Sequence, residues 1–508
     1  MRQFLFTLVF AFLTPVALAD HPDILMIAID DLRPMLGCYG DQRVQSPNID
    51  ALARRGVLFD RAYCQYAKCG TSRLSLMTGL RPDSIGVFSN NVRDVIRFRQ
   101  RRGEVASIAR WLRQSGYHTQ SFGKIYHDGW DDPRDWSVPS SPGRDREMLE
   151  IVNEDRPDQA STIADRWACP VLQSPDVSDE QLFAGRMTSA VIRTLQQAKD
   201  DKPIFLAVGY RRPHLPFVAP KRYYDLYDPD QTWLTPNPTP AIDSPVMAWF
   251  NSDGYVGSAK RAGLEMPLRP DRQQAVAWNG YEMRSYLGVP NHGEIETAKQ
   301  IQLLHAYAAC ISYVDAQIGR LIDQLRGSKR FENTVVILWS DHGWHLGEQS
   351  AWGKMTNFEI ATRVPLIIIA PGLTPARTEA ITELIDLYPT ICELANIDPP
   401  KHLQGESLLR VLRNPQAEGH SIALSQFARF GDKYMGRALR NQQYRFVAWM
   451  ENETDRVVDR ELYDHQTDPG ETRNLAGESS NAQIVRQLEA QLREAFPDRP
   501  NERGQIQR

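Results

Sequence analysis

The sequence lacks most features that would assign it to a specialised class of protein. Only six of its 508 residues are cysteine, and no two form a Cys-x-x-Cys pair. A disulfide-framed fold and a structural zinc site are therefore excluded. Positive charge is not in excess, because 59 Lys and Arg oppose 63 Asp and Glu for a net charge of −4. Binding of nucleic acid through bulk charge is not expected.

Long hydrophobic runs are also scarce, and the only one occupies residues 4–19 at the N-terminus. Arg2 precedes it, Pro15 interrupts it, and it ends in Ala17-Leu18-Ala19. It is shorter than the ~20 residues that a membrane-spanning helix needs. The pattern predicts a signal peptide over residues 1–19, cleaved after Ala19. We expect a secreted or periplasmic protein that is free of the membrane after cleavage. The oxidising surroundings outside the cytoplasm would permit one or two disulfide bridges.

The remaining sequence has an ordinary globular composition, with 42% apolar residues. Four nearly continuous apolar runs indicate parallel strands that are covered on both faces. They span residues 23–29, 203–209, 334–340 and 365–370. Helical periodicity between and beside them covers residues 105–115, 180–198 and 301–325. Strands that alternate with helices predict an α/β sandwich with a large, mainly parallel central sheet.

Two regions depart from this alternation. Residues 227–291 are rich in Pro, Asn, Asp and Trp without clear periodicity, and we interpret them as a substrate-facing cover. After about residue 415, shorter strands are expected at 434–440, 444–449 and 461–464, followed by an amphipathic helix over about 481–496. The predicted organisation is a catalytic domain over residues 20–414 and a smaller C-terminal α+β subdomain over residues 415–508.

Side chains that bind metals follow two of the expected strands. Asp30 and Asp31 end the first strand, and Asp341 and His342 end the third. Ligands in open α/β folds bind at the carboxyl ends of strands, where adjacent carboxylates can hold a hard divalent cation. One Asp-Asp pair alone would be explained as a turn with a helix cap. Two such strand ends together predict a metal site.

A third segment, from Cys69 to Gly79, reads CGTSRLSLMTG. We expect Cys69 at the start of a helix, where free backbone N–H groups favour an anion. Arg73 follows one turn later on the same face and can reach the same pocket. The segment resembles the type I sulfatase motif, Cys-x-Pro-Ser-Arg followed by Thr-Gly, in which the cysteine is oxidised to formylglycine. Thr71 stands where that family has Pro or, less often, Ala.

The resemblance extends along nearly the whole mature chain and is strongest to the iduronate-2-sulfatase branch. The matching stretches are 30–41, 46–50, 78–83, 123–127, 209–217, 341–348, 352–358 and 461–475. No single stretch identifies the family, but so many matches in the same order along the chain do. The resemblance implies an alkaline-phosphatase-like fold, and hydrolysis of sulfate esters of sulfated polysaccharide fragments. It also implies, as a partner, a formylglycine-generating or sulfatase-maturating enzyme.

The resemblance assigns roles residue by residue. The metal ligands of the sulfatase family match Asp30, Asp31, Asp341, His342 and the modified Cys69. The ion in sulfatases is usually calcium. His342 stands where many sulfatases have Asn, in agreement with the iduronate branch. The other matching site residues are Arg73 for the formylglycine hydroxyls, Lys124 and Lys354 for the sulfate oxygens, His127 as base and His214 beside the leaving-group oxygen.

The substrate suggested by this branch is a 2-sulfated uronic acid. Arg211 and Arg212 flank His214 and are candidates to pair with the uronate carboxylate, because Arg binds carboxylates with two donors. A solvated basic turn is the simpler explanation of the pair. Related sulfated sugars of marine polysaccharides are an open alternative.

Two other functions stay open at this point. A phosphodiesterase or phosphonate hydrolase of the same superfamily would share the metal ligands, although Lys124, His127 and the 352–358 block favour sulfate. A non-catalytic binder of sulfated glycans would result if Thr71 prevented modification of Cys69. The complete set of metal-binding and histidine residues argues against such a loss of activity.

Overall fold

The computed structural model describes residues 21–140, 169–198, 202–328 and 330–496. The predicted signal peptide over residues 1–19 lies outside the described residues. Within the described ranges, no helix combines the length and the apolar character needed to cross a membrane. All six cysteines are described, and none of them forms a disulfide.

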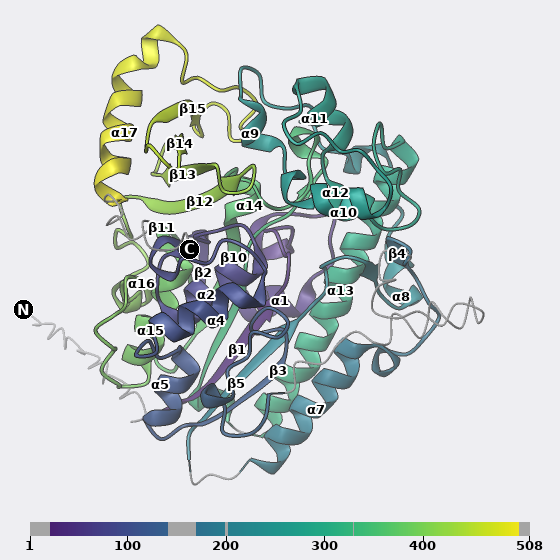
Figure 1. The fold of residues 1–508 in the computed structure, drawn as a ribbon. Helices are drawn as coiled ribbons and strands as arrows, with labels where there is room; N and C mark the ends of the chain where they lie inside the picture. The colour runs from purple at the N-terminus through teal and green to yellow at the C-terminus, as the bar shows by residue number, and fades with distance from the viewer. Residues whose placement is uncertain (1–20, 141–168, 199–201, 329, 497–508) are drawn as a thin grey trace, which may run out of the picture.

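A seven-stranded sheet forms the centre of the molecule, in the order β11-β2-β10-β7-β1-β5-β3 (Figure 1). Its strands are β1 (Asp23–Ile29), β2 (Val57–Tyr63), β3 (His118–Gly123), β5 (Ile204–Tyr210), β7 (Thr334–Ser340), β10 (Arg363–Ile369) and β11 (Ala376–Glu383). Six strands point the same way, and β10 alone is antiparallel to its neighbours β2 and β7. The mainly parallel sheet is confirmed.

The direction of the strand expected at residues 365–370 is wrong, because this run lies in the antiparallel β10. The physical reason is the position of β10 inside the sheet. Six of its seven residues are buried, so its hydrophobicity reports that both faces are covered. Burial carries no information about the direction of the strand.

Helices cover both faces of the sheet, and alternate residues of β1 enter two separate cores. One core includes α1 (Pro47–Ala53), α7 (Phe183–Gln197) and α13 (Thr297–Gly327). The other includes α2 (Cys69–Thr78), α3 (Pro82–Ile85), α4 (Val92–Arg101), α5 (Ile108–Gln114), α15 (Leu387–Leu394) and α16 (Leu409–Arg413). The helices predicted at 105–115, 180–198 and 301–325 are confirmed as α5, α7 and α13.

Residues 227–291 contain short helices and no strand. These are α9 (Val246–Trp249), α10 (Val256–Arg261), α11 (Arg272–Trp278) and α12 (Tyr281–Arg284). Their apolar side chains, such as Trp249 and Tyr281, pack with Trp449 and Tyr463 of the C-terminal sheet. The absence of periodicity in the sequence therefore corresponds to short turns of helix that are held by tertiary packing.

The C-terminal region forms a four-stranded antiparallel sheet, shown in yellow-green at the top of Figure 1. Its strands are β12 (Ala423–Arg429), β13 (Tyr434–Arg440), β14 (Tyr444–Glu451) and β15 (Val457–Asp464). Helix α17 (Ala482–Ala495) covers one face through a core that includes Leu488 and Leu492. The smaller α+β subdomain is thus present, with β12 as a strand that the sequence did not reveal. The boundary at residue 415 stays a prediction.

Short elements complete the fold. They are the strand pairs β4 (Leu172–Gln173) with β6 (Phe217–Val218) and β8 (His345–Leu346) with β9 (Trp352–Gly353), and the helices α8 (Lys221–Tyr224) and α14 (Glu359–Thr362).

A buried charge cluster joins the two sheets. His420, just before β12, contacts Asp386 with Nε2 2.8 Å from Oδ2. Glu383, at the end of β11, accepts the Leu424 N–H at 2.8 Å and pairs with Arg81. Burial disfavours the imidazolium, but the hydrogen bond and charge of Asp386, then the charge of Glu383, raise the pKa of His420 to about 9. Protonated His420 thus holds β12 against the main sheet.

This cluster predicts a loss of stability at alkaline pH. Because the folded-state pKa of His420 lies above the ordinary value of 6.5, its contribution is fully present below pH 6.5 and is lost as the pH rises through 9. We expect a loss of about 1–3 kcal/mol over this window. Thermal unfolding at pH 6 and pH 9.5 measures it, with His420→Gln as the comparison. An equal pH dependence in protein and variant would contradict the prediction.

Candidate active site

The carboxyl ends of β1 and β7 bring four of the five predicted metal ligands together. The two strands are parallel neighbours with Ile29 opposite Ser340, so the residues that follow them meet at one edge. The Asp31 N–H donates to Asp341 Oδ1 at 3.2 Å, and His342 Nε2 lies 3.5 Å from Asp31 Oδ1. The side chains of this group are completely buried: Asp30, Asp31, Asp341 and His342.

Asp31 has an unusual backbone. Its φ is +59°, in the left-handed region, which is uncommon for residues other than glycine and concentrates at functional sites. The Tyr307 hydroxyl donates to the Asp31 carbonyl at 2.7 Å, and the Leu32 N–H donates to Ser340 Oγ at 3.1 Å. These bonds hold the strained turn that points two successive carboxylates into one site.

Helix α2 begins at Cys69, as predicted, and its first turn faces the carboxylates. Cys69 Sγ lies 3.3 Å from His342 Nε2 and 3.3 Å from Lys354 Nζ. One turn later, Arg73 donates from Nε to Asp341 Oδ2 at 2.8 Å and from Nη2 to Asp30 Oδ1 at 3.1 Å. The Arg73 guanidinium is fully buried. Cys69 and Arg73 therefore lie on the same face of α2, as predicted.

Two lysines enter the same site. Lys124 follows β3, and its Nζ forms an ion pair with Asp30. Lys354 follows β9, and its Nζ lies 2.8 Å from Asp31 Oδ1. The Lys124 N–H donates to the Gly209 carbonyl at 2.9 Å. A Cβ at Gly209 would collide with the Lys124 backbone, so glycine is needed at this close approach.

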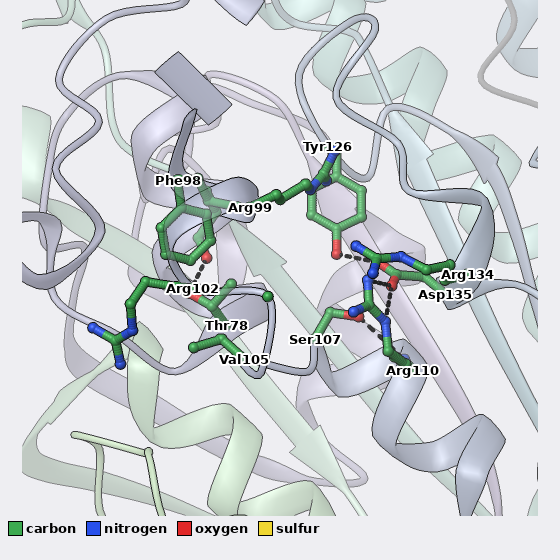
Figure 2. A pocket seen from close by; sticks show the side chains of 12 residues that line it. Thr78, Phe98, Arg99, Arg102, Val105, Ser107, Arg110, Tyr126, Arg134 and Asp135 are labelled. Carbon is green, nitrogen blue, oxygen red and sulfur yellow. Dashed lines mark hydrogen bonds and ion pairs between the residues drawn. The ribbon is translucent and has the colours of Figure 1, made fainter. Parts of the chain in front are cut away.

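The segment that carries Lys124 and His127 is anchored from behind by a charged pocket (Figure 2). Figure 2 shows Tyr126 pointing toward Asp135, and its hydroxyl donates to Asp135 Oδ2 at 2.6 Å. Arg110 donates to the other oxygen of Asp135 at 3.0 Å. Tyr126 is thus fixed in this pocket, one residue before His127.

The two histidines differ in their surroundings. His127 Nδ1 is buried and forms no hydrogen bond with any described residue. Burial, and then the charge of Lys124, lower the pKa of His127 to about 3. His214 Nδ1 lies 2.7 Å from the Leu215 carbonyl, so Nδ1 carries the hydrogen. His214 Nε2 lies 3.9 Å from Asp31 Oδ2. Burial, followed by Lys354, lowers the pKa of His214 well below its usual value.

The predicted carboxylate-binding pair lies beside these histidines. Arg211 forms an ion pair with Asp128, the residue after His127. Arg212 is buried and donates from Nη1 to the His214 carbonyl at 2.9 Å. Both arginines therefore have partners within the protein, and Arg212 supports the backbone of His214. Contact of either one with substrate stays a prediction.

The electrostatics of the site fit a divalent cation. Ligand atoms of Asp30, Cys69, Asp341 and His342 lie within 4.8 Å of one another. Burial raises the pKa of Asp31 well above its usual value despite Lys354, and burial followed by Asp30 raises the pKa of Cys69 to about 11. Asp30 differs, because Lys124 and Arg73 outweigh its burial and hold its pKa well down. Crowded carboxylates of this kind are a donor set that a hard cation binds.

The structure also brings in a residue that the sequence did not single out. Glu282, on α12, lies with Oε1 3.5 Å from Lys354 Nζ and 3.7 Å from His214 Nε2. It belongs to the 227–291 region interpreted as a substrate-facing cover. The sequence thus predicted that this region faces the substrate, but it did not indicate which of its residues reach the site.

Comparison with known proteins identifies the family. The model of the Sulfatase family matches residues 22–397. A second model, the C-terminal region of N-sulphoglucosamine sulphohydrolase, matches residues 347–497. Iduronate 2-sulfatase of Homo sapiens is 31% identical to this chain, in an alignment covering 92% of the chain and 94% of the human protein. A sulfatase of Formosa agariphila is 28% identical, with coverage of 93% and 85%.

Solved structures share the fold. A protein in complex with its substrate D-glucosamine-2-N,6-O-disulfate superposes with a TM-score of 0.67 at 22% identity, covering 94% of this chain and 97% of the other. A phosphonate monoester hydrolase of Agrobacterium radiobacter gives a TM-score of 0.69 at 22% identity, with coverage of 94% and 96%. The chain thus has an alkaline-phosphatase-like fold and belongs to the sulfatase family, whose members hydrolyse sulfate esters.

Proposed function

We propose that this chain hydrolyses sulfate esters of sulfated polysaccharide fragments in the manner of an iduronate-2-sulfatase. The reaction would use a formylglycine made from Cys69 and a divalent cation, by resemblance calcium. The observation that carries the proposal is the position of Cys69 at the start of α2, with Lys354 Nζ and His342 Nε2 each 3.3 Å from Sγ. A nucleophile at a helix N-terminus beside a lysine is suited to an anionic substrate.

The cation would be held by Asp30, Asp31, Asp341, His342 and the modified Cys69, and would supply charge stabilisation at the sulfuryl oxygens. Formylglycine, when hydrated, supplies one hydroxyl to attack sulfur and a second whose loss of a proton expels sulfate. The protein's own cations bind the same group. Lys124 and Lys354 are buried and pair with Asp30 and Asp31, and Arg73 keeps Asp30 and Asp341 in place.

The histidines would move the protons. The Nδ1 hydrogen of His214 is bonded to the Leu215 carbonyl, so Nε2 is the nitrogen that faces Asp31 and Glu282. Nε2 would give a proton to the departing sugar oxygen from the imidazolium form, in which both nitrogens carry hydrogen. Burial lowers the pKa of His214, which makes that imidazolium a strong acid. His127 keeps Nδ1 without a hydrogen-bond partner among the described residues. Its lowered pKa keeps it neutral near pH 7, which is the form that can accept a proton from the second hydroxyl.

Paired assays test the reaction class. We expect release of sulfate from an aryl sulfate to exceed hydrolysis of the matching aryl phosphodiester and phosphonate monoester. The mass of the Cys69 peptide should show conversion of the thiol to the aldehyde in the active fraction. Faster hydrolysis of the phosphorus esters would favour the phosphonate hydrolase alternative. Binding of sulfated sugar without turnover would favour the non-catalytic alternative.

The substrate is proposed to be a 2-sulfated uronic acid, with Arg211 or Arg212 pairing with its carboxylate. Arg211 has the better position, since its side chain is 13% exposed while Arg212 is buried. A panel of 2-sulfated uronides and neutral sulfated sugars, analysed by chromatography, decides between them. We expect desulfation of the uronide and a weaker reaction in Arg211→Ala. Release of sulfate only from neutral sugars would contradict the uronate proposal.

The location outside the cytoplasm and the need for a maturation enzyme belong to the same proposal. The N-terminal signal pattern supports the first, and the motif around Cys69 supports the second. Neither a nucleic acid nor a membrane is part of the proposed activity.

A further inference from the structure

A carboxylate lies among the cations of the proposed sulfate site, and it has an oxygen without a partner. Glu282 Oε1 contacts Lys354 and His214, at 3.5 and 3.7 Å. Its other oxygen, Oε2, is buried and accepts no hydrogen bond of ordinary geometry from any described residue. Burial, followed by the charge of Glu282, raises the pKa of Tyr255 well above its usual value, so the Tyr255 hydroxyl is a further neighbour of this carboxylate. The side chain is 12% exposed. Buried polar atoms are nearly always paired, so an unpaired one at an active site requires an explanation.

Pairing with Lys354 does not explain why a carboxylate is present at position 282. Both oxygens of Asp31 already accept hydrogen bonds from Lys354 Nζ, at 2.8 and 3.0 Å. The contact of Glu282 with the same ammonium is longer, at 3.5 Å. A second acid is therefore not needed to satisfy this lysine. Close to a sulfate pocket, a carboxylate also repels the anion that the pocket must bind.

The position of Glu282 is nevertheless built by a dense set of hydrogen bonds. The Asn251 amide donates to the Lys354 carbonyl and accepts the Gly280 N–H, each at 2.9 Å. Asn251 thus ties α12 directly to the loop that carries Lys354. The buried Arg284 donates to three backbone carbonyls at 2.7–3.0 Å, namely those of Asn279, Pro290 and Gly293.

The charge of Glu282 also acts on the pKa values of Tyr255 and Lys68, but neither residue donates to Oε2 in ordinary hydrogen-bond geometry. Oε2 is therefore able to accept a hydrogen bond from the substrate. In the proposed function, His214 Nε2 serves the oxygen that links the sugar to sulfate. Glu282 lies 3.7 Å from that nitrogen, so the substrate group next to it is the hydroxyl on the neighbouring sugar carbon. A hydroxyl can donate to a carboxylate, whereas a second sulfate at this carbon would be repelled.

We propose that Glu282 is a specificity-determining residue that binds the free hydroxyl on the sugar carbon next to the sulfated one. It selects sugars with that hydroxyl and rejects sugars that are sulfated there. The proposal rests on the proposed hydrolysis of sulfated sugars. It adds a named contact to the part of the substrate that does not react, and it gives the irregular 227–291 region its role at the site.

The test compares two substrates in two proteins. The probes are the 2-sulfated uronide monosaccharide and its 3-deoxy counterpart, which lacks the neighbouring hydroxyl. Hydrogen bonds to charged groups predict that kcat/KM of the wild-type protein is about 10- to 100-fold higher for the hydroxyl-bearing sugar. In Glu282→Ala this preference should fall to within about 2-fold. The variant has no carboxylate to accept the hydrogen bond, so it does not distinguish the two sugars.

Glu282→Gln keeps the shape and one acceptor oxygen, and it serves if the alanine variant does not fold. We expect it to retain part of the preference and to be inhibited at least 5-fold more strongly by the 2,3-disulfated uronide, since the repelling charge is gone. The matched control is Glu265→Gln, an exposed glutamate of the same region, which should change neither ratio.

Three results would overturn the proposal. In the first, Glu282→Ala keeps the full preference of the wild-type protein for the hydroxyl-bearing sugar, while kcat/KM falls equally for both sugars. Glu282 would then only position Lys354 and His214. The second is equal inhibition of Glu282→Gln and wild type by the disulfated sugar. The third is hydrolysis of an aryl sulfate with no release from any sulfated sugar. Only the third also removes the proposed sugar substrate, so the two failures are distinguishable.

Discussion

Asp31→Asn is expected to lower turnover on the order of 1,000-fold and to remove the bound divalent cation. Asp31 lies at the centre of the site, with Lys354 Nζ 2.8 Å and His342 Nε2 3.5 Å from its Oδ1. Loss of a metal that stabilises charge by several kcal/mol corresponds to about three powers of ten in rate. Asparagine is the cleaner replacement, because it tolerates the φ of +59° at this position better than alanine does.

The same variant should also change the charge balance of the site. Without the Asp31 carboxylate, Lys354 keeps only the more distant Glu282 and the Cys69 sulfur among the partners described above. A buried charge without its partner is destabilising, so Asp31→Asn should unfold at a lower temperature when both proteins are metal-free. Asp31→Ala should lose metal and activity in the same way, with additional backbone strain.

Metal analysis after dialysis and sulfate release from an aryl sulfate measure the two effects. The matched control is Asp228→Ala, an exposed aspartate of the cover region, which should keep both the cation and the activity. Full activity of the wild-type protein after treatment with a chelator, with no metal detected, would show that the carboxylate cluster is not a metal site.

Much of the site follows from local sequence rules. Asp30 and Asp341 end neighbouring parallel strands, and the carboxyl ends of parallel strands meet at one edge, so two separate motifs predict one cluster. Cys69 and Arg73 are one helical turn apart, so they share one face of α2, and the resemblance to sulfatases placed that face at the cluster. These predictions needed no knowledge of distant packing.

The parts that escaped prediction depend on such packing. Glu282 reaches the site because Asn251 accepts the Gly280 N–H before α12 and Arg284 donates to backbone carbonyls around it. No periodic pattern in the sequence marks such bonds. Arg212 donates to the His214 carbonyl, a contact that the sequence did not indicate, and its pairing with substrate stays a prediction. The antiparallel direction of β10 escaped because hydrophobicity reports burial and not direction.

A chain in which Cys69 remains a thiol is expected to show no turnover. Burial, followed by the charge of Asp30, raises the pKa of Cys69 to about 11, so the thiol is protonated near pH 7 and is a poor nucleophile. A thiol that did attack sulfur would also have no second hydroxyl with which to expel sulfate. Activity per molecule should therefore follow the fraction of Cys69 that is converted to formylglycine.

We expect Thr71 to set this fraction. Maturation acts on the unfolded segment, where β-branched Thr favours an extended backbone but lacks the fixed φ of proline. In the folded protein Thr71 is buried in the first turn of α2, and its hydroxyl donates to the Val87 carbonyl at 3.0 Å. Proline is tolerated in a first helical turn, so Thr71→Pro should fold with the loss of one hydrogen bond, about 1 kcal/mol.

We expect partial conversion of the wild-type chain made in a foreign host, and higher conversion and activity in Thr71→Pro. The mass of the Cys69 peptide, which falls when thiol becomes aldehyde, is read beside turnover per molecule. Thr71→Val is the matched control, since it removes the same hydroxyl without the proline ring and should lose stability with no gain in conversion. Full activity in a preparation where every Cys69 remains a thiol would overturn both this prediction and the formylglycine mechanism, because an unmodified side chain would then be supplying the nucleophile.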